Sequence, residues 1–352
     1  MSLFSNIKGT IQNKQLYGKN RAIFDSLVAD IEYYAKEIKP EEKSLGNHEH
    51  FMKKEIQDKI LKEIQENNNV LYIKGGKLKQ TLAMMAAEVG FERVVLEALD
   101  NENASLLTDT EGKNLGMYAA YHKLEKATLK ALDNKQASLQ KCKYWGKNIG
   151  MYAADSKMET VVLKALENNE ASTQQDADGF NLGMHCANFQ LEKATLKALD
   201  NPIASVQQNK GGYNIGMFAA KYGLEQATLK ALDNYTASYQ KTKYGSNIGI
   251  LAAAKELSYA AAKAVELYPD IALDDDHWNH SIRLYVNQSL IRKVNVDVNR
   301  ETAYALEELY FEDQYQRAKE QYDESFMKIV KAEKKQFNTQ SDLDIYETEL
   351  GD

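Results

Sequence analysis

The sequence has little cysteine, little proline and no long apolar run. Its two cysteines, Cys142 and Cys186, are too few for a disulfide scaffold and fit a reducing compartment. Three prolines in 352 residues are fewer than a loop-rich β protein normally has, which favours helices. No run approaches the roughly 20 apolar residues that a membrane-spanning helix needs. The first residues also lack a signal-peptide pattern, so we expect a cytoplasmic protein.

A strong excess of positive charge is also missing. The chain has 44 basic and 51 acidic residues and a net charge of -7, and the segment after residue 277 is its acidic part. Nucleic-acid binding therefore has little electrostatic support, and we expect no nucleic-acid partner. A hydrophobic fraction of 43% with 27% charged residues is typical of a folded chain rather than a disordered one.

What the sequence does contain is an internal repeat. The phrase Gly-x-Asn-(Leu/Ile)-Gly recurs every 33 or 34 residues, beginning at Gly112, Gly146, Gly179, Gly212 and Gly245. Four copies continue with Met-x-(Ala/Cys)-Ala, and a copy without its glycine lies one period upstream at Thr81. Six units therefore run from about residue 79 to 277, and such a period indicates a repeat architecture.

Each unit is interpreted as a turn and two helices. The leading glycine suits a turn residue with positive φ, and the asparagine two places later is a good N-cap for a first helix. Alanines in this helix allow close packing, and Cys186 occupies one of the alanine positions, which predicts that it is buried. The stretch from Leu124 to Leu132 has leucines on one face and lysines on another, as an amphipathic second helix does. An Ala-Ser pair then leads into the next loop.

These units resemble the ankyrin repeat family, whose period is 33 residues and whose signature reads Gly-x-Thr-Pro-Leu-His-x-Ala-Ala. The resemblance covers residues 79–277 and implies an all-α solenoid of about six ankyrin-like repeats with helical N- and C-terminal extensions. Asn replaces the family's Thr and keeps the cap. Gly replaces its Leu inside the first helix, where glycine is costly, so we expect close neighbours there.

The ends of the chain are predicted to be helical. Residues 1–78 contain apolar stripes at helical spacing and are interpreted as an N-terminal cap. Residues 278–338 are interpreted as a capping segment and a long helix from about Glu301 to Phe337, whose apolar side packs on the repeats or, alternatively, on a partner or second copy. Residues 339–352 are polar and acidic and are predicted to be unstructured.

The resemblance also indicates where a partner binds. In ankyrin proteins the turn tips and the inner edge of the first helix form a concave face, and here these positions collect aromatic residues and lysines, which are common in binding hot spots. Counted from Ala137 to Asn148, one loop is a residue longer than the others, and it contains Tyr144 and Trp145. The predicted site comprises Tyr118, Tyr121, Tyr144, Trp145, Lys147, Tyr152, Phe180, Phe189, Lys210, Tyr213, Phe218, Lys221, Tyr222, Lys243 and Tyr244.

Candidate catalytic chemistry is sparse. No nucleotide-binding loop, nucleophile elbow or other catalytic motif is present, and we expect no cofactor and no metal. Metal-ligand residue types crowd together at 48–50 and 274–280 without a zinc-like spacing. The alternative hypothesis is an enzyme with a small site there or in the N-terminal segment. Cys142 is expected in an exposed loop.

Diverged ankyrin arrays with helical ends also resemble effectors that intracellular bacteria deliver by type IV secretion. The polar end of the chain, residues 341–352, is similar to their C-terminal signals. This resemblance implies a polypeptide partner in a host cytosol, whereas a resident cytoplasmic adaptor is the alternative.

Overall fold

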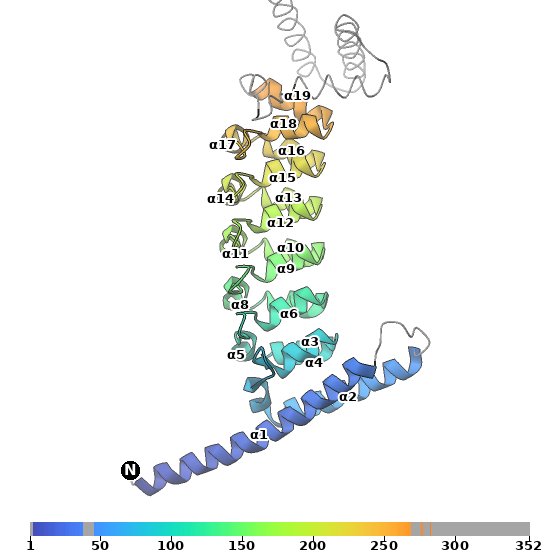
Figure 1. Cartoon of the computed structure of the whole chain (residues 1–352), viewed down its shortest axis with the longest axis vertical. Helices are drawn as coiled ribbons and strands as arrows, with labels where there is room; N and C mark the ends of the chain where they lie inside the picture. The colour runs from blue at the N-terminus through green and yellow to red at the C-terminus, as the bar shows by residue number, and fades with distance from the viewer. Residues whose placement is uncertain (1–2, 38–45, 269–275, 277–281, 283–352) are drawn as a thin grey trace, which may run out of the picture. The chain divides into compact units, whose positions relative to one another are not determined.

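The repeat phrase produces a three-helix unit. We obtained a computed structural model of the chain that describes residues 3–37, 46–268, 276 and 282. It divides into two compact units, Met1–Lys210 and Gly211–Asp352. The predicted all-α solenoid class is confirmed, because helices stack in sequence order within each unit (Figure 1). Among the described residues, the only paired strands are β1 (Lys74–Gly75) and β2 (Gln80–Thr81), which are antiparallel.

The first unit begins with long helices. α1 (Leu3–Glu37) and α2 (Gly46–Glu66) lead through a 3-10 turn, η1 (Asn68–Tyr72), to β1. α1 packs on α3 and α2 packs on α4. Phe24 and Leu27 of α1 and Ile60 of α2 are buried. One of the apolar stripes expected in residues 1–78 consists of Phe51, Ile56, Ile60 and Ile64; Ile60 and Ile64 are buried, but Phe51 is 75% exposed. The long C-terminal helix and the acidic end lie outside the described residues.

The repeats of the first unit follow. The first helices are α3 (Leu82–Glu88), α6 (Leu115–Tyr121), α9 (Ile149–Asp155) and α12 (Leu182–Asn188). The second helices are α4 (Glu92–Leu99), α7 (Glu125–Ala131), α10 (Glu159–Ala165) and α13 (Glu192–Ala198). The third helices are α5 (Glu102–Ser105), α8 (Lys135–Leu139), α11 (Asn169–Thr173) and α14 (Pro202–Val206).

The second unit repeats this order. It contains α15 (Ile215–Lys221), α16 (Glu225–Ala231), α17 (Tyr235–Tyr239), α18 (Ile248–Ala254) and α19 (Ser258–Leu267). The expectation of two helices per repeat was therefore wrong. The Ala-Ser pair lies inside a short third helix, which begins at an asparagine whose side chain accepts a hydrogen bond from the alanine N–H, as Asn168 does from Ala171 at 3.2 Å.

The glycines behave as the pattern predicts. The leading glycines all have positive φ, between 64° at Gly146 and 88° at Gly245, a conformation that residues with a Cβ rarely adopt. Inside the first helix of its repeat, Gly216 lies so close to Ala231 and Ile248 that a Cβ would be 2.5 and 2.7 Å from their methyl carbons. The expected close neighbours are therefore present.

Second helices are capped by the preceding repeat rather than by themselves. Leucine or methionine precedes α7, α10 and α13, and none of these residues makes a side-chain cap. Instead, Glu159 accepts a hydrogen bond from Ala194 N–H at 3.3 Å. At the other end, the Lys164 ammonium donates to Leu129 O at 2.9 Å and pairs with Asp133 at 2.6 Å. The charged face of the second helix thus joins neighbouring repeats.

Candidate interaction surface

The base of each loop is fixed by a buried asparagine. Asn148 has 1% of its surface exposed; its oxygen accepts from Met151 N–H at 3.1 Å, and its amide donates to Ala171 O at 2.9 Å and to Gln174 Oε1 at 3.0 Å. Gln174 in turn donates to Leu139 O of the preceding repeat. The predicted N-cap is confirmed, and the same side chain also fixes the third helix of its repeat and, through Gln174, contacts the preceding repeat.

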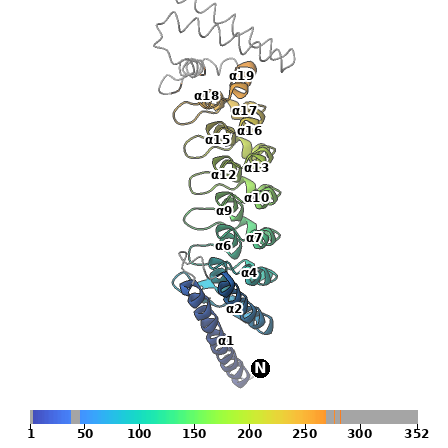
Figure 2. The ribbon, with the colours of Figure 1, turned by 90° about the vertical axis from the view of Figure 1, so that its right-hand side faces the viewer.

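The loop that precedes each first helix is called a finger here, and Figure 2 shows fingers projecting along one side of the repeats in the first unit. The Trp145 finger (residues 141–147) contains the predicted extra residue. In the neighbouring finger (175–180), Asp176 N–H donates to Phe180 O, four residues away. In the Trp145 finger, Cys142 N–H donates to Lys147 O, five residues away. The longer turn carries Tyr144 and Trp145.

This finger is held on both sides. Lys143 N–H donates to Glu111 O of the preceding finger at 2.7 Å, and Trp145 O accepts from Ala177 N–H of the following finger at 2.8 Å. Its two large rings nevertheless face solvent: Tyr144 is 72% and Trp145 61% exposed. A fixed backbone thus presents two aromatic side chains to the surroundings.

The structure sorts the predicted site residues by accessibility. Exposed side chains are Tyr121, Tyr144, Trp145, Lys210, Lys243 and Tyr244; half-buried ones are Lys147, Phe180, Phe189, Tyr213, Lys221 and Tyr222. Tyr118, Tyr152 and Phe218 are only 3–6% exposed and fill space inside the repeats. In the second unit, the Lys221 ammonium lies 5.1 Å from the centre of the Tyr213 ring. The predicted positions therefore differ in how much of each side chain is exposed.

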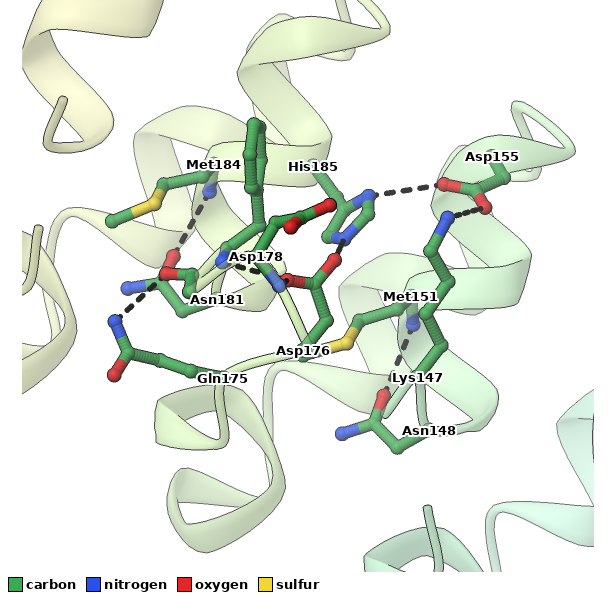
Figure 3. A network of polar contacts seen from close by, with 12 residues as sticks. Lys147, Asn148, Met151, Asp155, Gln175, Asp176, Asp178, Asn181, Met184 and His185 are labelled. Carbon is green, nitrogen blue, oxygen red and sulfur yellow. Dashed lines mark hydrogen bonds and ion pairs between the residues drawn. The ribbon is translucent and has the colours of Figure 1, made fainter. Parts of the chain in front are cut away.

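Behind the Trp145 finger lies a buried polar network that the sequence analysis missed (Figure 3). Its centre is His185 of α12, whose side chain is 6% exposed. His185 Nδ1 lies 3.0 Å from Asp155 Oδ1, and His185 Nε2 lies 3.0 Å from Asp176 Oδ2. Asp155 also pairs with the Lys147 ammonium at 2.5 Å. The rings of Phe180 and Phe189 flank the imidazole, with centroids 5.5 and 6.5 Å away.

Charge stabilises this arrangement. Burial alone would lower the pKa of His185, but hydrogen bonds to the two carboxylates raise it above its ordinary value of 6.5. Burial would likewise raise the pKa of Asp155 and of Asp176, but His185 and other hydrogen-bond donors lower both below 3.8. Three groups in contact thus favour their charged forms together.

The network occupies positions that recur between repeats. Counted from the N-cap of the first helix, which is Asn148 in one repeat and Thr81 in the first, Lys147 and Asp155 correspond to Gln80 and Glu88, which are also hydrogen-bonded to each other. His185 and Asp176 correspond to Tyr118 and Asp109, and the Tyr118 hydroxyl donates to Asp109 at 2.7 Å. A comparison of equivalent positions in adjacent repeats can identify this polar network, whereas a search for local motifs cannot.

Both cysteines are buried and unpaired with each other. Cys142 was expected to be exposed but is 3% exposed, and it accepts a hydrogen bond from the Tyr152 hydroxyl at 3.5 Å. Cys186 is fully buried, as predicted, and burial raises the pKa of its thiol. Within residues 3–37, 46–268, 276 and 282, no three His, Cys, Asp or Glu side chains are arranged to hold a metal ion.

The two metal-like clusters fall largely outside what is described. The side chains at 48–50 lie beyond the described ones, and of 274–280 only Asp276 is described; it is 6% exposed and accepts from the Ser246 hydroxyl at 3.3 Å. None of the described helices has both the length and the apolar character needed to cross a bilayer.

Comparison with known proteins gives a structural neighbour. No protein-family model matches the sequence, and no curated protein matches it significantly. Among solved structures, the ankyrin repeat domain of Bcl-3, a member of the IkappaB protein family, is similar with a TM-score of 0.48 and 12% identity. The match covers 60% of this chain and 98% of that domain.

Proposed function

We propose that the chain is a polypeptide-binding scaffold and that the Trp145 finger is the centre of its binding surface. The observation that supports this most directly is the exposure of Tyr144 and Trp145 on a backbone that both neighbouring fingers hold in place. Large exposed rings add nothing to the packing of the repeats. Binding hot spots are rich in Trp and Tyr, and a fixed backbone loses little conformational entropy when it binds.

Charge at this finger favours a partner with acidic side chains. The exposed lysines Lys141 and Lys143 donate their ammonium hydrogens to the backbone carbonyls of Gln175 and Thr110. In the described part of the chain, no carboxylate pairs with either lysine, so their positive charge is available to a partner. The second unit contains a similar run, in which Lys241 and Lys243 are followed by Tyr244, 50% exposed.

A site-specific photo-crosslinker tests this proposal. The full chain with a benzophenone amino acid in place of Trp145 should capture a polypeptide, and the captured partner is then used in affinity measurements. Tyr17 on α1 provides a matched position, because it is also 61% exposed. Capture at position 17 but not at 145 would refute the proposed surface.

We extend the proposal to a cellular setting, in which the chain reaches a host cytosol through the polar end at 341–352. A reporter fused to the N-terminus, with and without the residues after Thr339, tests this extension. Delivery that depends on those residues supports it, and unchanged location in the producing cell favours a resident adaptor. The binding proposal does not depend on either result. No observation in the described residues favours the enzyme alternative.

A further inference from the structure

The buried network around His185 connects back to the Trp145 finger by two routes. In the first route, Lys147, which belongs to the finger, forms an ion pair with Asp155, and Asp155 contacts His185 Nδ1. The other passes through the next finger, because His185 Nε2 contacts Asp176, and the adjacent Ala177 N–H donates to Trp145 O. The contacts form a closed ring that includes both sides of the Trp145 finger.

The protonation state of His185 determines whether this closed set of contacts can form. A neutral imidazole has one N–H and one lone pair, whereas the protonated ring has two N–H donors. Both ring nitrogens face a carboxylate oxygen at 3.0 Å. Only the protonated ring donates to both carboxylates, because a lone pair opposite a carboxylate is repelled.

Among the described residues of the first unit, the charged groups that face the His185 imidazole are Asp155 of α9, Asp176 of the next finger and Lys147 of the Trp145 finger. Asp178, in the same finger as Asp176, instead pairs with Lys210 at 3.6 Å. The two carboxylates outweigh the single nearby ammonium.

Asp176 transmits the contact to the finger turn. Its second oxygen, Oδ1, accepts from Asp178 N–H and from Phe180 N–H, both at 2.9 Å, and so shapes the turn that presents Ala177. Movement of Asp176 therefore changes the position of the N–H that holds Trp145 O.

We propose that His185 is a positioning residue for the Trp145 finger: when protonated it holds the finger against its neighbour, and loss of the proton releases the finger. The biological use of this switch rests on the proposed binding function. The release of the Trp145 finger itself can be measured without a partner. When His185 is protonated, the Tyr144 and Trp145 side chains are presented on an ordered finger. As His185 loses its proton, partner affinity falls.

The test uses Trp145 as its own reporter. Trp278 is the chain's other tryptophan, so Trp278→Phe leaves Trp145 as the single indole. Acrylamide quenching and fluorescence anisotropy of the full chain are followed from pH 5 to 9 without a partner. We expect quenching to rise about twofold, and anisotropy to fall, over the pH range in which NMR shows His185 to titrate.

The repeats supply the matched variants. His185→Tyr places at this position the residue found at Tyr118, whose hydroxyl donates to the equivalent aspartate; it should keep the finger ordered and remove the pH dependence. Asp155→Asn should move the transition to lower pH, because one carboxylate no longer stabilises the protonated ring. Tyr118→Phe alters the corresponding contact with Asp109 in the preceding finger, which holds the other side of the Trp145 finger through Glu111 O. It leaves His185 and its two carboxylates in place, so the midpoint of the transition should not move.

Two results would overturn the proposal: quenching of Trp145 that stays constant while His185 titrates, or a transition that persists in His185→Tyr. If Asp155→Asn shifts the transition but partner affinity does not depend on Trp145, the positioning role stands and the proposed binding function fails. If partner affinity depends on Trp145 but quenching of Trp145 does not follow the titration of His185, the proposed binding function stands and the positioning role of His185 fails.

Discussion

The side-chain amide of Asn181 donates a hydrogen bond to the carbonyl oxygen of Ala204, 23 residues later, at 2.8 Å. The same amide donates to Gln207 at 2.8 Å, and its oxygen accepts from Met184 N–H at 3.0 Å. The asparagine of the repeat phrase is thus more than a helix cap. It joins the first helix of a repeat to the third helix of that repeat.

Replacing Asn181 by Ala should therefore cost more than an ordinary cap. Loss of a cap costs about 1 kcal/mol, and leaving a buried carbonyl and a buried amide partner unsatisfied adds about 1–3 kcal/mol. We expect a total loss of about 2–4 kcal/mol in the free energy of unfolding, measured by urea denaturation, with faster hydrogen exchange in α12 and α14.

Asn168 provides the comparison. It caps the short α11, is half-buried, and makes one further hydrogen bond, from its amide to Ser138 Oγ at 3.0 Å, so Asn168→Ala should cost about 1–2 kcal/mol. Equal losses for the two variants would contradict the larger contribution expected from the buried hydrogen bonds of Asn181.

The glycine inside the first helix should be required for packing. Gly216→Ala would raise helix propensity but force a methyl group against Ala231 and Ile248, and overpacking costs about 1–3 kcal/mol. Gly18→Ala in α1 is the control, because nothing lies within 4 Å of its added methyl group. It should stabilise α1 by about 0.5–1 kcal/mol. Thermal unfolding of both variants measures the difference; a Gly216→Ala protein as stable as the parent would contradict the packing argument.

The sequence allowed prediction of those features that depend on neighbours in the chain. The positive φ at Gly146 and the caps at Asn148 and Asn181 follow from local chemistry, so one repeat phrase predicts them in every unit. The third helices were not predicted because they are four or five residues long and show no apolar periodicity. An Asn cap and hydrogen bonds to the preceding repeat, such as Asn168 to Ser138, hold them instead.

The candidate site was harder to predict because its contacts are distant in sequence. His185 lies 30 residues from Asp155 and 9 from Asp176, so no local cluster reveals the network. Burial of Cys142 follows from its place at the base of the finger, where Asp109 and Thr242 of other repeats are also buried, at 4% and 5% exposure, and where the thiol accepts from the Tyr152 hydroxyl. The exposed Tyr144 and Trp145 were predicted correctly as accessible, because a loop tip with an extra residue offers nothing for the rings to pack on.

Trp145→Ala should separate binding from folding. The ring is 61% exposed, so its removal should leave the melting temperature within a few degrees of the parent. Affinity for the captured partner, measured by isothermal titration calorimetry, should fall by at least about 2 kcal/mol, as for a hot-spot residue. Tyr17→Ala removes an equally exposed ring and should change neither quantity. Unchanged affinity in Trp145→Ala would place the binding surface elsewhere.

Stability should depend on pH through the His185 network, and the signs follow from the shifted pKa values. The folded pKa of His185 lies above 6.5, so the folded state holds the proton more tightly than the unfolded state does. Its contribution is therefore complete below about pH 6.5 and is lost as pH rises through the folded pKa.

The pKa values of Asp155 and Asp176 lie below 3.8, so their contribution is present above that pH and is lost as pH falls through the folded values. Urea unfolding of the parent and of His185→Tyr is compared between pH 5 and 9, above the pH at which Asp155 and Asp176 titrate in the parent. The difference in unfolding free energy should decline with rising pH above about 6.5. A constant difference would mean that folding does not shift the pKa of His185, and a difference that rises with pH would mean that the folded state disfavours the protonated imidazole.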